Sequence, residues 1–243
     1  MKGKAVLVTG AAHRVGAQVV KLLHENGANV ILHYRSSDSA AKAIADELNN
    51  KRASSVALLY ADLSDIQACE SLIESAAKCF GRLDALINNA SSFYPTPIAS
   101  ATEDQWNDLM ASNLKAPFFI SKAAIPHLSE NKGCIVNIVD IHADKPLKDH
   151  SIYCMAKAGL VMMTKSLAKE LGPDIRVNAV APGAILWPEG MEDDVKNEIL
   201  SRTALKQKGN PMDIAKTLLF LIRDADYITG QIIPVDGGRS LNL

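Results

Sequence analysis

Tyr153 and Lys157 carry the most reactive pair of side chains that this sequence places at a defined spacing. They lie four residues apart in Ile152–Leu171, where apolar residues recur at helical spacing, so both are expected on one face of a helix. A phenol has a pKa of about 10, and a nearby positive charge favours its ionised form. The pair therefore predicts a proton donor for a reduction, in which Lys157 lowers the pKa of Tyr153. The alternative is a solvent-exposed pair without a chemical role.

A carboxylate precedes this pair. Asp140 ends the run Asn137-Ile138-Val139-Asp140, thirteen residues before Tyr153. An ionised carboxylate would repel the negative charge that develops on a carbonyl oxygen during its reduction, whereas it can hold and relay a proton to a ring nitrogen. We therefore predict that Asp140 and Tyr153 deliver protons together. Helix capping or a place in a surface loop is the alternative for Asp140.

A loop of small residues supplies a candidate binding site for phosphate groups. Thr9-Gly10-Ala11-Ala12-His13-Arg14-Val15-Gly16 follows the apolar run Ala5–Val8 and opens the helical pattern Val15–Asn26, which is the context that a dinucleotide-binding loop requires. Small side chains let the backbone approach a pyrophosphate, and free N–H groups at a helix start bind its charge. Arg14 stands where a third glycine is usual, and we expect it to contact phosphates or an anionic ligand. A glycine turn that binds no nucleotide is the alternative.

The segment after the second predicted strand indicates which dinucleotide binds. Leu32-His33-Tyr34-Arg35-Ser36-Ser37 has no carboxylate to grip the two hydroxyls of an NAD ribose, whereas Arg35 with the two serines suits a 2′-phosphate. NADP(H) is therefore the predicted cofactor, and an exposed loop cation is the alternative for Arg35. Farther along, Asp62-Leu63 is placed to accept from the adenine amino group, and Asn88-Asn89-Ala90 leaves room for a ribose.

The elements that must position these residues alternate along the chain. Short apolar runs rich in β-branched residues predict strands at Ala5–Val8, Val30–Tyr34, Ser55–Tyr60, Ala85–Asn88, Cys134–Val139, Arg176–Ala181 and Gln231–Val235. Helical spacing is found in Val15–Asn26, Ser39–Asn49, Ile66–Cys79, Thr102–His127, Ile152–Leu171 and Pro211–Arg223. This alternation predicts an α/β fold with a doubly wound parallel sheet of about seven strands and helices on both faces. Asp140–His150 and Gly183–Asn210 resist assignment, and they lie beyond strand ends, where such sheets bind ligands.

Composition limits the function classes. The chain has 243 residues, 48% of them hydrophobic and 22% charged, and a formal net charge of −1, which suits one globular domain over residues 1–243 and no nucleic-acid partner. Four cysteines lack the spacing of a zinc site or of a secreted disulfide framework, so we expect no metal. The sequence also shows neither a signal peptide nor a membrane span. We expect a cytoplasmic protein.

Together these motifs resemble the short-chain dehydrogenase/reductase family. The resemblance covers nearly the whole chain and is carried by TGxxxRxG at the loop, NNA, Ser112-Asn113-Leu114, YxxxK, and Arg176-Val177-Asn178 with Pro182-Gly183. It implies Asn113, Asp140, Tyr153 and Lys157 as catalytic residues. Asn113 would kink its helix and hold a water near Lys157, with a plain polar helix residue as the alternative. The implied cofactor-binding residues are Gly10, His13, Arg14, Val15, His33, Tyr34, Arg35, Ser36, Asp62, Leu63, Asn89, Ala90, Ser91, Lys157, Pro182 and Gly183.

One departure from that family narrows the resemblance. Most members have a serine at the place of Asp140, and an aspartate there, with Arg14 and the run Asn88–Pro97, resembles the pteridine reductases. A pterin is a flat heteroaromatic ring that Phe93 would sandwich against the nicotinamide, with core packing as the alternative. Trp187 would belong to a lid, with loop packing as the alternative. The implied substrate-binding residues are Arg14, Ser91, Phe93, Asp140, Tyr153 and Trp187.

The function expected from this resemblance is NADPH-dependent reduction of dihydropterins, with dihydrofolate as a further candidate substrate. One alternative is a short-chain reductase of another carbonyl substrate, such as a 3-oxoacyl thioester. A second alternative is a non-catalytic protein that senses NADPH, against which the intact Tyr153 and Lys157 argue. The resemblance also implies a homotetramer.

Overall fold

Seven parallel strands form one sheet in the computed structural model, which describes residues 1–187 and 190–242. The order across the sheet is β3-β2-β1-β4-β5-β6-β7, and every neighbouring pair is parallel. The strands are β1 (Ala5–Val8), β2 (Asn29–Tyr34), β3 (Val56–Tyr60), β4 (Ala85–Asn88), β5 (Cys134–Ile138), β6 (Arg176–Pro182) and β7 (Ile232–Val235). The predicted doubly wound sheet is therefore confirmed.

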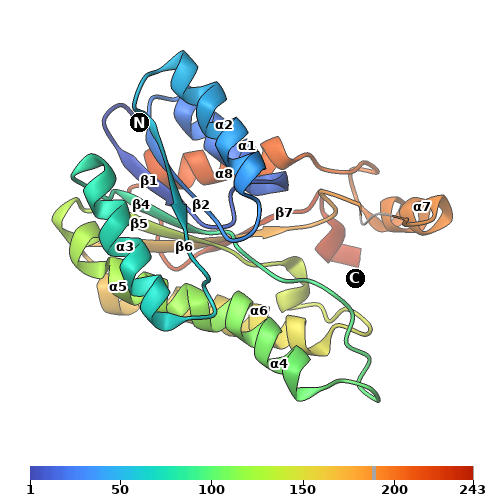
Figure 1. Cartoon of the computed structure of the whole chain (residues 1–243). Helices are drawn as coiled ribbons and strands as arrows, with labels where there is room; N and C mark the ends of the chain where they lie inside the picture. The colour runs from blue at the N-terminus through green and yellow to red at the C-terminus, as the bar shows by residue number, and fades with distance from the viewer. Residues whose placement is uncertain (188–189, 243) are drawn as a thin grey trace.

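Helices cover both faces of this sheet (Figure 1). Contacts join α1 to α2 and α8 on one side, and α3 to α5 and α4 to α6 on the other. The helices are α1 (Arg14–Glu25), α2 (Asp38–Lys51), α3 (Ile66–Phe80), α4 (Glu103–Met110), α5 (Ala116–Glu130), α6 (Ser151–Leu171), α7 (Asp193–Arg202) and α8 (Pro211–Arg223). None of the described helices is long and apolar enough to span a membrane.

The core consists of two apolar layers separated by the sheet. In β1, Val6 and Val8 pack into the layer beneath α1 and α8, whereas Ala5 and Leu7 pack into the layer beneath α3 and α5. All four side chains are fully buried. Successive residues of a strand point to opposite faces, and this explains why the strands read as continuous apolar runs rather than alternating ones.

One predicted helix contains a wider turn. The sequence predicts helical structure over Thr102–His127 with a kink at Asn113, and the structure has α4, a π-helical turn over Ala111–Lys115, and then α5. The π-helical turn admits an extra residue without breaking the run of backbone hydrogen bonds. The start of α4 is well defined, since Thr102 and Gln105 form a capping box.

The two stretches left unassigned each contain a short element. A 3-10 turn over Ile141–Ala143 follows Asp140, and α7 lies within the Gly183–Asn210 stretch. Because all the strands are parallel, their carboxyl ends lie at one edge of the sheet. The order reverses between β1 and β4, and ligands bind open α/β sheets outside the strands' carboxyl ends at such a reversal.

Candidate active site

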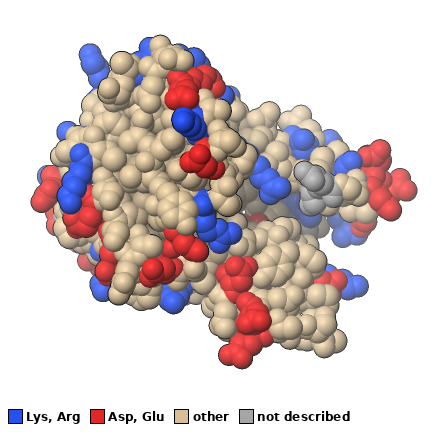
Figure 2. Space-filling view, in the orientation of Figure 1, with Lys and Arg blue, Asp and Glu red and all other residues tan. Residues whose placement is uncertain are grey.

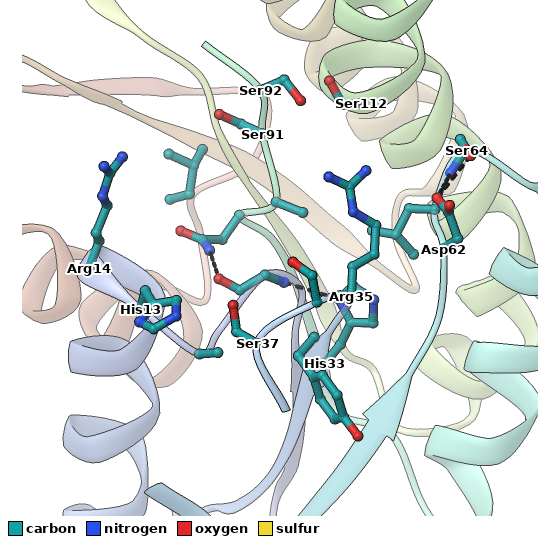
Figure 3. Close-up of a pocket in the computed structure, with 18 of the residues that line it drawn as sticks. His13, Arg14, His33, Arg35, Ser37, Asp62, Ser64, Ser91, Ser92 and Ser112 are labelled. Atoms are coloured by element: carbon teal, nitrogen blue, oxygen red, sulfur yellow. Dashed lines mark hydrogen bonds between the residues drawn. The ribbon is translucent and has the colours of Figure 1, made fainter. Parts of the chain in front are cut away.

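A cavity of about 620 Å³ opens at this edge, a size typical of ligand pockets (Figure 3). Thirteen of the predicted cofactor-binding residues line it, and they come from the ends of β1 to β4: Gly10, His13, Arg14, Val15, His33, Tyr34, Arg35, Ser36, Asp62, Leu63, Asn89, Ala90 and Ser91. In the space-filling view, basic side chains border the hollow between the main body and the part that carries α7 (Figure 2). The loop and strand ends that sequence motifs singled out therefore meet around one cavity.

Close backbone packing shapes the floor of the cavity. A Cβ atom at Gly10, whose φ is +61°, would lie 2.8 Å from Ala90 Cα, and one at Gly16 would lie 2.8 Å from Ala11 Cα. Asn89 Nδ2 donates to Thr9 O over 2.8 Å. Gly10 N donates to His33 Nδ1 over 3.0 Å. The loop between β1 and α1 is thus held in a form that only glycines at these positions permit.

Two arginines lie at different sides of the cavity. In Figure 3, Arg14 lies beside His13, whereas Arg35 lies on the side of Asp62. Arg14 has a φ of +51°, a left-handed conformation that is unusual for a residue other than glycine. Asp62 accepts from both the backbone N–H and the hydroxyl of Ser64, and these bonds lower the pKa of its carboxyl. Both guanidinium groups can therefore contact phosphates bound in the cavity. The carboxyl group of Asp62 stays ionised.

Asp140 and Tyr153 are in direct contact. Tyr153 Oη donates to Asp140 Oδ2 over 2.8 Å, and the other carboxylate oxygen accepts from His142 N over 2.8 Å. Asp140 therefore caps the 3-10 turn with one oxygen and contacts the phenol with the other. The two interpretations offered for this residue, helix capping and a place beside Tyr153, both hold.

The electrostatics of Tyr153 differ from the prediction. Burial, together with the charge and the hydrogen bond of Asp140, raises the pKa of Tyr153 well above its ordinary value. Lys157 Nζ lies 5.7 Å from the centroid of the Tyr153 ring and donates to Ile138 O over 2.9 Å. The prediction that Lys157 lowers the pKa of Tyr153 is wrong for this structure, because the sequence could not give the weight of burial and of the adjacent carboxylate. The phenol stays protonated and serves as a donor.

Lys157 is itself an unusual group. Its side chain is only 2% exposed, and burial lowers its pKa to about 8, although the charge of Asp140 acts in the opposite direction. A buried ammonium loses its hydration and is replaced in part by its neutral form. Lys157 is therefore poised to change charge near neutral pH.

Asn113 lies in the π-helical turn and is fully buried. Its Nδ2 donates to Ser92 O over 2.9 Å and to Leu109 O over 3.0 Å, and its Oδ1 has no hydrogen-bond partner among the described residues. A buried amide oxygen without a partner is costly unless a ligand or a water fills the role. The interruption of the helix at Asn113 agrees with the predicted kink.

Phe93 is not a core residue. Its side chain is 48% exposed, its ring stacks on His150 at 4.7 Å and 16°, and it meets Tyr153 edge to face at 4.8 Å. The core-packing interpretation is therefore wrong. A half-exposed aromatic face next to the phenol can receive a flat ligand.

Several predicted site residues are described by the structure but do not line this cavity. These are Phe93, Asn113, Asp140, Tyr153, Lys157, Pro182, Gly183 and Trp187. Lys157 and Asn113 reach the wall through their hydrogen bonds to Ile138 and Ser92. Gly183 instead packs against Asp236, which a Cβ atom would approach to 2.6 Å. Trp187 is half-buried, and its neighbour Leu186 lines the wall in its place.

Sequence reasoning missed part of the wall. Residues from the end of α4 and from the π-helical turn line it, namely Asn107, Asp108, Ala111 and Ser112, together with Ile138 and Leu186. A continuous helix over Thr102–His127 offered no reason to choose among its faces, and only Asn113 carried a motif. Over residues 1–187 and 190–242, no three His, Cys, Asp or Glu side chains gather closely enough to hold a metal ion.

Comparisons with known proteins agree with this geometry. Residues 10–240 match the model of a family described as enoyl-(acyl carrier protein) reductase. The chain is 35% identical to pteridine reductase 1 of Leishmania tarentolae, over 97% of this chain and 96% of that protein. It is 36% identical to the 3-oxoacyl-(acyl-carrier-protein) reductase FabG of Staphylococcus aureus, over 97% of each. The corresponding reductase of Chlamydia muridarum is 34% identical, over 98% of this chain and 97% of that protein.

Proposed function

Because this chain belongs to the short-chain dehydrogenase/reductase family of nicotinamide-dependent oxidoreductases, we propose that it uses NADPH to reduce dihydropterins to their tetrahydro forms. Dihydrobiopterin, dihydromonapterin and dihydrofolate are the candidate substrates. The observation that carries the proposal is the 2.8 Å hydrogen bond from Tyr153 Oη to Asp140 Oδ2. A carboxylate in contact with the proton donor opposes an oxyanion, whereas it supports protonation of a ring nitrogen.

The cavity suits the pyrophosphate and the 2′-phosphate of NADPH. Gly10 and Gly16 let the loop after β1 pack closely on Ala90 and Ala11, where a Cβ atom would collide, and the start of α1 presents free N–H groups to a pyrophosphate. Arg35, with Ser36 and Ser37 beside it on the wall, would hold the 2′-phosphate. A bound NADPH supplies the hydride.

The chain's own residues supply the proton. Burial and Asp140 keep the Tyr153 phenol protonated, so Tyr153 can give its proton to a ring nitrogen of the substrate. Asp140 is partly exposed, and after taking a proton from solvent it can return one to the Tyr153 oxygen. Lys157, held by Ile138 O, would support the phenolate that forms for a moment and bond the cofactor ribose.

Substrate orientation follows from the aromatic face. Phe93 presents a half-exposed ring beside Tyr153, so a flat pterin lying on this ring has its edge toward the proton donor. Arg14 and Ser91, both on the cavity wall, would meet the polar edge of the pterin or the cofactor phosphates.

A second candidate is reduction of a 3-oxoacyl thioester. It is favoured by the similarity to the Staphylococcus aureus 3-oxoacyl-(acyl-carrier-protein) reductase, which at 36% identity is as high as that to pteridine reductase 1. In this case the carboxyl group of Asp140 would have to take the place of the family's serine hydroxyl beside the carbonyl oxygen.

Oxidation of NADPH, followed by absorbance, distinguishes the candidates. Dihydrobiopterin, dihydromonapterin, dihydrofolate and an acetoacetyl thioester are offered in turn to the purified protein. Turnover of the pterins or dihydrofolate supports the proposal, and turnover of the thioester alone refutes it. Tight NADPH binding without any turnover would instead support a sensor.

Two variants test the carboxylate. Asp140→Asn keeps the shape of the side chain but removes its charge, and we expect kcat for the pterin to fall by roughly 100-fold or more, within the range of general acid and base catalysis. Asp140→Ser restores the family's usual residue and should raise thioester turnover relative to pterin turnover. Unchanged pterin rates in Asp140→Asn would leave this carboxylate without a role in proton delivery.

A further inference from the structure

A third arginine, Arg239, lies in the C-terminal segment that follows β7 at the carboxyl edge of the sheet. Arg239 begins a 3-10 turn over Arg239–Asn242 just after β7. The preceding residues Gly237 and Gly238 have φ values of +63° and +79°. Asp236 accepts from Gly238 N over 2.9 Å and from Ser240 N over 2.8 Å. The direction of the backbone at Arg239 is therefore set by this turn.

The turn is also attached to the segment before α8. Leu205 N donates to Gly237 O over 3.0 Å, and Asn242 Nδ2 donates to Arg202 O over 3.0 Å. Figure 1 shows the C-terminal turn beside the connection that leads to α7. The turn that contains Arg239 is thus attached to the last residue of α7 and to the segment that follows it.

The sheet register places Arg239 near Asp140. Ile138 of β5 pairs with Val180 of β6, and Pro182 of β6 pairs with Val235 of β7. Since Asp140 follows Ile138 by two residues, it lies level with Val235, two strands away, which is about 10 Å at the usual strand spacing. Arg239 lies four residues past Val235 at the same end of the sheet, and the charge of Asp140 acts on its guanidinium.

Arg239 carries a buried donor without a partner, and its guanidinium is near enough to Asp140 for the carboxylate charge to act on it. Its Nε is buried and has no hydrogen-bond partner among the described residues. Burial lowers the pKa of its guanidinium, and the charge of Asp140 is the largest opposing influence. The ion pairs within 4.0 Å that the described residues form do not join Arg239 to Asp140. An unpartnered donor of Arg239 thus lies within the electrostatic reach of Asp140 without forming an ion pair with it.

We infer that Arg239 is a substrate-binding residue whose guanidinium donates to an oxygen of the substrate, on the side opposite the proton donor. This inference rests on the proposed function and specifies its substrate further. The ligand must present an oxygen acceptor to Arg239 while it presents a ring nitrogen to the Asp140–Tyr153 pair. In a pterin or folate that oxygen belongs either to the ring oxo group or to a carboxylate of the tail.

The test compares Arg239→Gln and Arg239→Lys with the wild-type protein. As a matched control, Arg202→Gln removes a neighbouring cation that is 59% exposed and paired with Glu198. KM and kcat are measured for dihydrobiopterin and dihydrofolate, NADPH affinity by fluorescence, and thermal stability by scanning. In Arg239→Gln we expect KM to rise roughly 10-fold or more, as for loss of a hydrogen bond from a charged donor. The value of kcat should change much less, NADPH affinity should be unchanged, and Arg239→Lys should recover part of the loss.

The two substrates identify the oxygen. An equal rise in KM for both indicates the ring oxo group, and a rise for dihydrofolate alone indicates the tail carboxylate. Unchanged KM for both substrates overturns the inference, as does a loss of NADPH affinity together with a lower melting temperature, which would show a structural role. If the wild-type protein turns over only the thioester, the pterin proposal fails. The same KM comparison on the thioester then still decides whether Arg239 binds a substrate oxygen.

Discussion

Replacing Lys157 with methionine should abolish activity without costing stability at neutral pH. Lys157 is almost completely buried, and its pKa falls from 10.5 to about 8. At about 1.4 kcal/mol for each pKa unit, keeping it charged at pH 7 costs the native state about 3 kcal/mol. Methionine fills a similar volume without charge but loses the bond to Ile138 O, and a hydrogen bond from a charged donor contributes about 1.5 to 3 kcal/mol. The variant should therefore be between equally stable and about 2 kcal/mol more stable at pH 7.

The pH dependence provides the sharper measurement. Between pH 8 and 10.5 the unfolded lysine is protonated and the native one is not, so the unfolded state binds more protons and the stability of the wild type rises with pH. Relative to Lys157→Met, the free energy of unfolding of the wild type should gain up to about 1.4 kcal/mol per pH unit in this window. Other groups titrate in both proteins, and the difference between the two cancels their effect.

Urea unfolding of both proteins at fixed protein concentration, at several pH values from 7 to 10, gives this difference. Lys165→Met removes an exposed lysine of the same helix and should show no comparable change with pH. A Lys157→Met protein more than about 1 kcal/mol less stable than wild type at pH 7, or a difference that stays constant up to pH 10, would refute the reasoning.

Arg35→Ala should weaken NADPH binding roughly 10- to 100-fold and leave NADH binding unchanged, because a hydrogen bond to a charged phosphate is lost; calorimetry that shows equal losses for both cofactors would contradict a 2′-phosphate site. Phe93→Ala should raise KM for a pterin roughly 10-fold or more through loss of aromatic contact, with NADPH affinity as the control, and an unchanged KM would remove the ring from substrate binding. The exposed side chains of Phe118, Met155 and Met162 suit burial in a subunit contact; light scattering should show a homotetramer that Met162→Glu dissociates, and a monomeric wild type would contradict this.

The five central strands of the sheet could be predicted from the sequence because they are buried on both faces. Ala5–Val8 and Ala85–Asn88 have the predicted bounds, since a short apolar run between glycine and polar residues has few other folds available. By contrast, Asp193–Arg202 forms α7 without a single buried residue. No apolar stripe marks such a helix, and periodicity cannot find it.

The positions of part of the cavity wall could be predicted from the sequence, but the electrostatics of the site could not. The loop after β1, Arg35 and Asp62 could be assigned to the cavity because each stands directly after a strand, at the carboxyl edge of the sheet. The raised pKa of Tyr153 was not, because it depends on burial and on a contact with Asp140 that only the folded chain creates. Arg239 carried no motif at all, and the backbone turn that precedes it depends on Asp236 and on two glycines in left-handed conformations.

The π-helical turn at Ala111–Lys115 lets the helical segments before and after it turn different faces toward the cavity and the core. A residue added to an α-helix rotates everything after it by about 100° about the helix axis. The extra residue therefore changes which side chains of the following segment lie on the same face as those of the preceding one. Asn107, Asp108 and Ser112 can face the cavity while Ile120 and Ala124 still point into the apolar interior. Deleting a single residue here would rotate one segment relative to the other, so that either the residues at the cavity or the residues in the core would lose their positions.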